Sequence, residues 1–496
     1  MRARFALAGL LACGCGSTRG DWPELESLPA SAPVSNAPLR NTLVERANWL
    51  LYKHELARAE HLANQALRDD PQNPDAHLIR AMVQWMRGQA EASAATTRAV
   101  LERVPDSYPA VYHLARILRA QGRVDEAITH LETWHHAMGP CSPERLCESK
   151  LDCEGDVHRC QVASAELLGY QLETEYLLAD PIAMLETAAE LEPLQGHLDS
   201  DFAAQPARLT QFARWLEPHA PLLEVEGDRG VLRAVSIDPQ WTSPAGTARA
   251  GGFEVLVVHN PMIHGALISE PLVEALELER LGTVEMASNR SSSDLVLVDD
   301  LSFGGLELHR VPAFSYASED PEDHTIFLGR QASQAFGALT LDLEAGELVV
   351  EREAPTTAPA GANEVPILQA DTGQGSVPLV PLHVGGTNPA LWLLFGVPGP
   401  PQMTLERQLL RGRVTGKADA EGMLTIDKLR LGDHQLGPLE VEVVDGVFGS
   451  FGAQIHTWTS LPFAGGLSYE LMSQWRVTHV PERGVVWLEP SEGPRP

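Results

Sequence analysis

The chain has 496 residues, of which 44% are hydrophobic, and a formal charge of −30 at pH 7. This length exceeds what one hydrophobic core supports, so the sequence predicts two to four domains. The acidic excess would repel a phosphate backbone, which excludes nucleic acid as a partner and favours a well-solvated acidic surface.

The N-terminus has the pattern of an export signal. Arg2 and Arg4 precede an apolar run that is too short to span a bilayer. The following Leu-Leu-Ala-Cys13 resembles the lipobox of bacterial lipoproteins. The resemblance implies that residues 1–12 are a signal peptide and that Cys13 is acylated. It places the protein in the bacterial cell envelope, with Gly14 favouring the outer membrane, facing the periplasm or the surface. An ordinary secretory signal is the alternative.

Residues 13–40 are rich in proline, serine, alanine and glycine, which predicts a disordered tether. From 41 to 137 the apolar spacing is helical, and Pro71 and Pro105 stand 34 residues apart. Ala81 and Ala115 repeat at the same spacing. This segment resembles tetratricopeptide repeat (TPR) arrays, whose period is 34 residues. The resemblance implies a solenoid that binds protein or peptide segments in its concave face; a helical spacer without a ligand is the alternative.

Cysteines are concentrated in residues 138–162, which we interpret as a loop. Its four members are Cys141, Cys147, Cys153 and Cys160. Because an exported chain meets an oxidising compartment, two disulfides are predicted, with a pairing that the sequence leaves open. A zinc site with His158 is the alternative, although the gaps are not the usual paired knuckles. Residues 163–220 are predicted to form a helical connector.

The C-terminal half contains an internal duplication with an offset of 136 residues. Its matching strings are FLGR (327–330) and QAFGALTL (334–341) in the first copy, and FAGG (463–466) and ELMSQWRV (470–477) in the second. Each copy ends in an apolar strand. The pattern resembles the retropepsin-like aspartic protease family, duplicated to give two lobes.

The predicted fold class is therefore multidomain α + β. An all-α TPR-like solenoid precedes a two-lobed, β-rich aspartic-protease-like domain, with lobe 1 at 221–352, a linker at 353–364 and lobe 2 at 365–490.

In that family an Asp-Thr-Gly follows an apolar strand, and two such carboxylates share a proton to activate water. A Ser or Thr that opens a short helix follows about nine residues after the Asp. Counting back from Ser269 gives Asn260, and counting back from Thr404 gives Phe395. Neither is a carboxylate, so the resemblance implies a degenerate site in both lobes.

The string Asp371-Thr372-Gly373 does occur, but it precedes a strand, where the family has a loop leading to a helix. We interpret it as a hairpin turn that matches residues 227–230 of lobe 1. Catalysis by Asp371 is the alternative.

These observations predict an envelope lipoprotein that scaffolds protein or peptide segments through its TPR face or its interlobe cleft, without cofactor or metal. The alternative is an active aspartic endopeptidase that uses Asp371.

Overall fold

The structure is a computed structural model. It describes residues 42–52, 55–139, 141, 153–198, 200–237, 243–285, 292–371, 376–385, 391–397, 402–410, 413–414, 416–445, 461 and 463–491. The predicted signal peptide, Cys13, the tether and Cys147 lie outside these residues.

Helices in antiparallel pairs form the array between residues 42 and 138. They are α2 (Thr42–Tyr52), α3 (Leu56–Asp69), α4 (Pro74–Met86), α5 (Ala90–Leu101), α6 (Tyr108–Ala120) and α7 (Val124–Met138). The repeat spacing has a structural basis, because Gly88 and Gly122 follow equivalent helices of successive repeats, α4 and α6, with φ of 80° and 81°. Ala81 and Ala115 have no exposed surface, as expected where the helices of a repeat pack closely.

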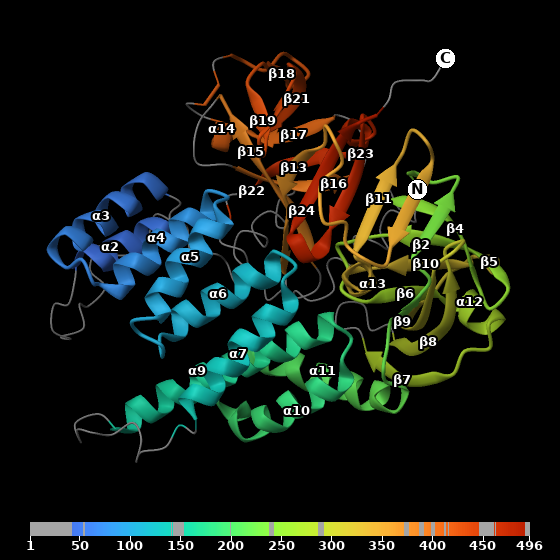
Figure 1. Ribbon diagram of the computed structural model, residues 1–496, viewed down its shortest axis with the longest axis horizontal. Helices are drawn as coiled ribbons and strands as arrows, with labels where there is room; N and C mark the ends of the chain where they lie inside the picture. Colours follow the sequence, from blue (N-terminus) through green and yellow to red (C-terminus); the bar gives the residue numbers. More distant parts are fainter. Residues whose placement is uncertain are drawn as a thin grey trace.

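A second group of helices connects the array to the β-rich part. It contains α9 (Cys153–Leu177), α10 (Pro181–Leu191), η1 (Glu192–His197), α11 (Ser200–Leu216) and η2 (Glu217–His219). Helix α9 starts at Cys153, so it takes in the last third of the segment that the sequence suggested to be a loop. In Figure 1, α2 to α5 extend away from the strands, whereas α6 and α11 lie next to them. Helix α9 reaches α13 of lobe 1, and α7 lies between α6 and α9.

Lobe 1 is built from strands around two short helices. The strands are β1 (Glu224–Glu226), β2 (Arg229–Arg233), β3 (Ser236–Ile237), β4 (Pro244–Ala250), β5 (Phe253–His259), β6 (Ala266–Ser269), β7 (Arg280–Glu285), β8 (Ser292–Ser302), β9 (Glu307–Tyr316), β10 (Thr325–Leu328), β11 (Ala338–Asp342) and β12 (Glu347–Glu351). The helices are α12 (Glu270–Ala275) and α13 (Arg330–Ala335).

Lobe 2 repeats this plan with shorter connections. Its strands are β13 (Asn363–Pro366), β14 (Leu368–Asp371), β15 (Ser376–Val384), β16 (Leu391–Val397), β17 (Met403–Glu406), β18 (Met423–Ile426), β19 (Leu429–Leu431), β20 (His434–Leu436), β21 (Leu439–Val444), β22 (Phe463–Ser468), β23 (Trp475–Val480) and β24 (Val485–Pro490). Its helices are α14 (Arg407–Leu410), α16 (Tyr469–Met472) and η3 (Pro481–Arg483).

A shared sheet joins the lobes in the order β13-β24-β23-β11-β12-β2. Three strands come from each lobe, and the central pair is antiparallel, with Thr340 opposite Thr478. Their hydroxyls lie 2.9 Å apart. Each strand of lobe 2 has a counterpart of lobe 1 at the mirrored place in this order: β13 matches β2, β24 matches β12 and β23 matches β11. The two lobes are therefore related by an approximate two-fold axis.

The order within each lobe sheet also repeats. Lobe 1 has β9-β6-β10-β5-β4 and lobe 2 has β21-β17-β22-β16-β15. In each lobe, one strand runs parallel to the strand that would carry the catalytic motif: β10 beside β5, and β22 beside β16. This duplicated arrangement is the retropepsin-like fold that the sequence predicts.

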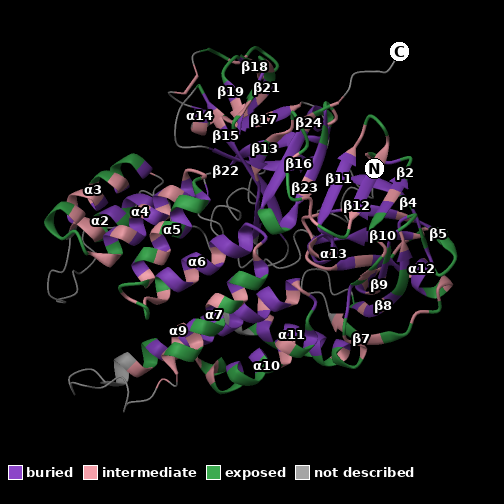
Figure 2. Ribbon diagram, in the orientation of Figure 1, coloured by how far each residue is buried: buried purple, intermediate pink, exposed green. Residues whose placement is uncertain are grey.

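The helical array and lobe 2 share one apolar core. Buried array residues such as Leu114 and Ile117 belong to the same cluster as Trp392 and Phe463 of lobe 2. Helix α6 is buried over nine of its thirteen residues, because it packs against the array on one side and the β-rich part on the other. Figure 2 shows this buried seam between α6 and the strands. The array is therefore fixed to the lobes by burial of apolar surface.

Two turns meet where the array reaches lobe 2. A Cβ on Gly122 would overlap the carbonyl oxygen of Pro481, and one on Gly484 would overlap that of Gln121. Both glycines have positive φ, 81° and 60°. The close backbone approach therefore depends on glycine at both turns.

We expect Gly122→Ala to destabilise the protein by about 2 kcal/mol more than Gly361→Ala. Both replacements put alanine at a positive φ, 81° and 86°, which costs about 1 kcal/mol. Only the first also creates an overlap, since nothing lies within 4 Å of a Cβ at Gly361. Urea unfolding of both variants measures the difference, and equal losses would show that the two turns do not touch.

Candidate functional site

The loop after β5 occupies the place of the catalytic loop in lobe 1. Its first residue, Asn260, is 3% exposed. The Asn260 backbone N–H donates to the Leu328 carbonyl at 2.9 Å, and its side-chain oxygen accepts from the Met262 N–H at 3.0 Å. The amide thus shapes the loop, and it has no ionisable proton for acid–base work.

The counterpart of Asn260 in lobe 2 is Val397, two residues beyond the predicted Phe395. Thr404 lies inside strand β17, and helix α14 starts only at Arg407. Counting nine residues back from the residue before the helix gives Asn260 in lobe 1 and Val397 in lobe 2. The sequence count was misplaced because a short strand was taken for the start of a helix.

Strand pairing supports the same match. Val397 pairs with Ser468, which caps α16, and Asn260 follows His259, which pairs with the residue before the α13 cap. Val397 is 9% exposed and belongs to the apolar cluster shared with the array. Among the described residues, the two structural counterparts of the catalytic position are an amide and an aliphatic side chain.

Asp371 lies on a different strand. It is the last residue of β14 and pairs with Ser376, the first residue of β15, so the motif falls at the end of a hairpin. The Asp371 side chain and residues 372–375 lie outside the described part. The hairpin end is not at an outer tip, because the Ser376 N–H donates to the Met262 carbonyl at 3.3 Å.

The lobe 1 counterpart of this hairpin also differs from the prediction. Residues 227 and 228 connect β1 to β2, whereas β14–β15 corresponds to β3–β4, where Ile237 pairs with Pro244. The matching connection is therefore residues 238–243, most of which lie outside the described part. The sequence comparison missed this because β3 has only two residues.

Helix α13 joins the lobes to the helices through a set of buried polar side chains. Arg330 is 1% exposed. Its Nη1 donates to the Gln369 carbonyl and to Ser376 Oγ, both at 3.3 Å. Its Nη2 donates to the Arg119 carbonyl of α6 at 2.6 Å. One guanidinium on lobe 1 thus contacts lobe 2 and the array.

The next residues of α13 bind other elements. Gln331 is 4% exposed and donates through Nε2 to the Tyr176 carbonyl of α9. Ser333, also 4% exposed, lies 3.1 Å from His259 Nε2. The α13 backbone holds the loop as well, because the N–H groups of Arg330 and Gln331 donate to Ile263 and His264 at 2.8 Å.

Helix α9 covers the far end of the same loop. The Tyr176 ring lies edge-on to His264, with centroids 6.4 Å apart, and its hydroxyl would be 3.1 Å from a Cβ on Gly265. Burial raises the pKa of Tyr176 to about 12, so the hydroxyl stays neutral. The loop that would face a substrate is therefore engaged by lobe 2, α13 and α9.

The cysteine-rich segment contains one described disulfide, between Cys141 and Cys160. It ties the end of the array to α9, and the sulfur of Cys141 lies 3.4 Å from Ser164 Oγ. The second predicted disulfide stays a prediction, because Cys147 and the side chain of Cys153 lie outside the described residues.

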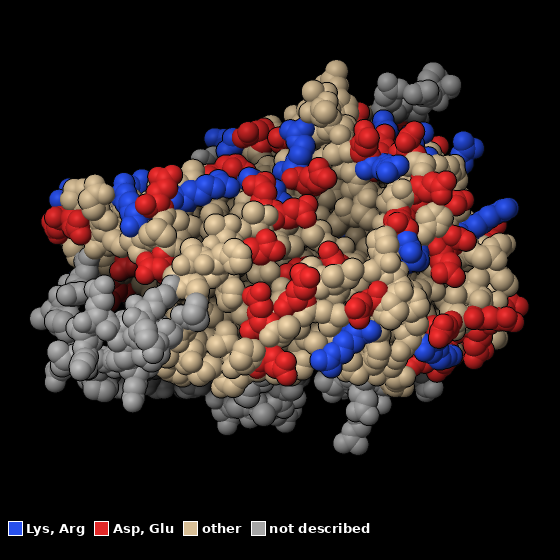
Figure 3. Space-filling view, turned by 60° about the horizontal axis from the view of Figure 1, so that its bottom comes forward, with Lys and Arg blue, Asp and Glu red and all other residues tan. Residues whose placement is uncertain are grey.

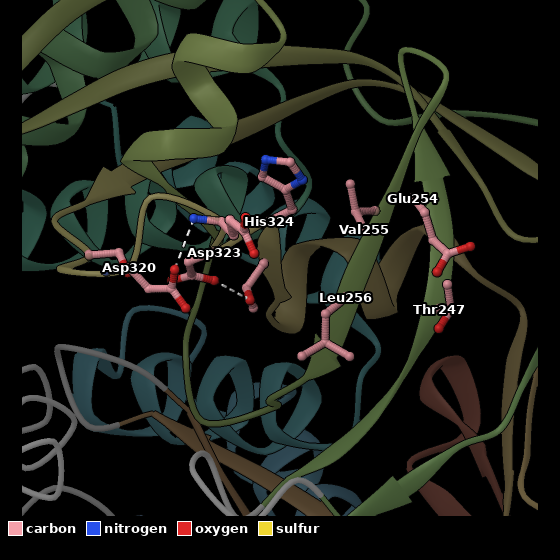
Figure 4. A pocket seen from close by; sticks show the side chains of 10 residues that line it. Thr247, Glu254, Val255, Leu256, Asp320, Asp323 and His324 are labelled. Atoms are coloured by element: carbon pink, nitrogen blue, oxygen red, sulfur yellow. Dashed lines mark hydrogen bonds between the residues drawn. The ribbon is translucent and has the colours of Figure 1, made fainter.

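An open hollow of about 460 Å³ lies on lobe 1. Its lining includes Glu254, Asp320, Glu322 and Asp323 (Figure 4). Asp323 accepts hydrogen bonds from Tyr316 and Thr325, which fixes the wall. The hollow lies at the start of β10, and α13 follows the other end of that strand. It is thus separate from the loop after Asn260. Figure 3 shows many Asp and Glu side chains on the face of the molecule that it draws.

Among the described residues, three side chains lie close enough together to hold a metal ion. They are Glu226, Glu307 and His309, whose ligand atoms lie within 4.8 Å of one another. Asp300 lies 2.7 Å from His309 Nδ1 and raises the pKa of that histidine. Both glutamates are exposed, so the group is a solvated ion-pair cluster of small energetic effect.

The comparisons with known proteins concern the helical array and the β-rich part separately. The sequence model of the tetratricopeptide repeat matches residues 44–107 and 87–137. Residues 44–137 are tetratricopeptide repeats. No helix within the described residues is both long and apolar enough to cross a bilayer.

Two solved structures overlap parts of the chain. A retropepsin-like aspartic protease from Rickettsia conorii is 8% identical, covering 26% of this chain and 92% of that one, with a TM-score of 0.19. MamA from Desulfovibrio magneticus RS-1 is 13% identical, covering 36% and 95%, with a TM-score of 0.20. No curated protein sequence matches. The retropepsin-like fold of the β-rich part thus rests on its own strand order.

We expect Arg330→Lys to destabilise the protein by about 3 kcal/mol at pH 7. A lysine ammonium cannot reproduce the planar fork that reaches Gln369, Ser376 and Arg119 together, so buried acceptors lose their donors. The exposed Arg476→Lys on β23 is the matched control, with an effect within about 0.5 kcal/mol. Urea unfolding decides, and equal small effects in both variants would contradict this role of Arg330.

Proposed function

We propose that this protein is an envelope-anchored lipoprotein that scaffolds protein or peptide segments through its tetratricopeptide repeats, on a non-catalytic protease-like body. The observation that carries the proposal is the combination of a repeat array with lobes whose catalytic positions hold Asn260 and Val397. Repeats of this kind generally mediate protein–protein contacts.

Absence of catalysis is supported by the environment as well as by residue identity. An aspartic dyad needs two carboxylates that share a proton beside a water molecule. Val397 instead lies in an apolar cluster that continues into the array. Asn260 uses its side-chain oxygen to hold the Met262 N–H. A carboxylate at the Asn260 position would therefore still face an aliphatic side chain at the Val397 position.

The first two repeats are the best candidates for the binding surface. The third repeat is engaged with the lobes, since α6 is mostly buried. Helices α2 to α5 extend away from the strands in Figure 1. Trp49 on α2 is 56% exposed, and aromatic side chains are enriched where proteins bind one another. A crosslinking pull-down from envelope extracts, with Trp49→Ala as the comparison, tests this surface.

One observation favours the alternative of an active aspartic endopeptidase. The Asp371 hairpin touches the loop after Asn260 through the bond from the Ser376 N–H to the Met262 carbonyl. A carboxylate at that hairpin end would thus lie near the interlobe junction. The alternative still requires a second carboxylate. Asp238 stands in the matching connection of lobe 1, residues 238–243, and lies outside the described residues.

We expect no acid-optimal peptidase activity, and no loss of any activity on Asp371→Asn. Asparagine suits a hairpin end about as well as aspartate. In a dyad, by contrast, losing one carboxylate would cost orders of magnitude in rate. The assay is cleavage of a peptide library between pH 3 and 7 by both proteins. Cleavage that peaks in acid and disappears in Asp371→Asn would establish a protease.

We expect Cys13→Ser to release the protein from the membrane fraction. The motive is the Leu-Leu-Ala-Cys13 string after a short basic and apolar leader. Without the thiol no acyl chain can be attached, and the described helices offer no span to replace it. Fractionation and intact mass measure the change. Unaltered membrane association and mass would rule out lipidation at this residue.

A further inference from the structure

Two histidines border helix α13 from opposite lobes. His259 is the last residue of β5 and lies 3.1 Å from Ser333 Oγ of α13. His479 is on β23 of the shared sheet, where it pairs with Leu339 of β11 and Val486 of β24. Its Nε2 is enclosed and has no hydrogen-bond partner among the described residues. Both rings are thus at the junction that α13 holds together.

The charges around these rings oppose their protonation. Among the described groups, two interact electrostatically with His479: His259 and Arg330. Both disfavour a positive charge on the His479 ring. Arg330 itself is 1% exposed, so water screens its charge poorly. Protonation of His259 and His479 would place two more positive charges near Arg330. They would repel its guanidinium, which binds lobe 2 and α6.

The other elements packed on α13 do not compensate. Arg119 on α6 is paired with Glu173 of α9 at 3.5 Å. In η3, Glu482 and Arg483 are exposed and of opposite charge. His264 in the loop would itself add positive charge if protonated. Among the described groups, no carboxylate contributes to stabilising His259 or His479 in the charged form.

We propose that His259 and His479 make the junction around α13 acid-labile, so that protonation of both rings releases α6 and α9 from α13 and separates the helical array from the lobes.

The direction of the pH effect follows from linkage. Burial lowers the pKa of His259 from 6.5 to about 4 and that of His479 from 6.5 to about 3. A group with a lowered folded-state pKa stabilises the docked form fully above 6.5, and that stabilisation is lost as the pH falls towards the folded value. Between pH 7.5 and 5.0 the loss is about 30-fold for each ring, or roughly 1000-fold for the pair.

Separation would expose two surfaces that are covered at neutral pH. One is the part of the loop that Tyr176 of α9 covers, at His264 and Gly265. The other is the lobe-facing side of α6. Acid would thus increase the surface available to a protein partner. The inference does not depend on the proposed function, because it concerns docking of the array and not what the array binds.

Hydrogen exchange of the full chain at pH 7.5 and 5.0 tests the proposal, after correction for the intrinsic pH dependence of amide exchange. We expect the α13 and α9 amides near the junction to lose at least about 100-fold protection at pH 5.0, relative to α3. Small-angle scattering on the same samples should show a larger radius of gyration at pH 5.0.

The variant His259→Gln/His479→Gln should abolish both changes, because glutamine keeps polar contacts and cannot become charged. If that double variant does not fold, each single variant should reduce the loss of protection by about 30-fold. His113→Gln is the matched control. It removes a buried histidine inside the array, 3.1 Å from Ser93 Oγ, and should leave the α13 response unchanged.

Three results would overturn the proposal. The first is unchanged α13 protection in the wild type at pH 5.0. The second is an acid response that persists when both histidines are replaced. The third is faster α13 exchange without any growth of the radius of gyration, which would mean local fraying of α13 while the array stays docked.

Discussion

Arg330 is the side chain on which the arrangement of the whole molecule depends. It lies on a six-residue helix of lobe 1, yet its acceptors belong to lobe 2 and to the array. A buried guanidinium is costly unless its donors are satisfied, so these three bodies must meet in one relative placement. Apolar burial across the α6 seam supplies affinity between them, but apolar contacts are not directional. The polar bonds of α13 supply the orientation, and the meeting turns of Gly122 and Gly484 permit the close approach.

The same placement constrains the loops that face each other in a two-lobed, retropepsin-like fold. In a two-lobed protease the facing loops must stay open to a substrate and to water. Here the loop after Asn260 gives its carbonyl groups to α13 and to Ser376. In lobe 2, strand β16 ends at Val397, in the core shared with the array. Opening these loops would lower the stability of the protein, because it would leave buried polar groups unpaired and expose apolar surface. The lobes thus hold the third repeat in one placement.

Much of this fold could be predicted from the sequence, because its signals are local. The 34-residue spacing of proline and alanine predicts the repeats, and Ala81 and Ala115 are fully buried as that period requires. The duplicated strings predict two lobes. The register within lobe 2 could not be read, since the Met403 strand resembles the start of a helix and a bulge interrupts the pairing before Val397. The contacts of α13 with lobe 2, α6 and α9 could not be predicted from the sequence either. Arg330, Gln331 and Ser333 look like an ordinary solvated helix until partners that are 211, 155 and 74 residues away are known.

Comparison of the two lobe helices shows how the duplication has diverged. In lobe 1, α13 buries Arg330, Gln331 and Ser333, whose bonds reach other elements. In lobe 2, the equivalent α16 buries Tyr469, Leu471 and Met472 in the core of the β-rich part. Tyr469 packs on Gly396, which has φ of 74° and leaves no room for a Cβ. Only one lobe therefore carries a helix suited to hold an outside domain. Two copies of α13 would offer two docking sites for one array, and two copies of α16 would offer none. The asymmetry of these short helices is thus what a single, uniquely placed array requires.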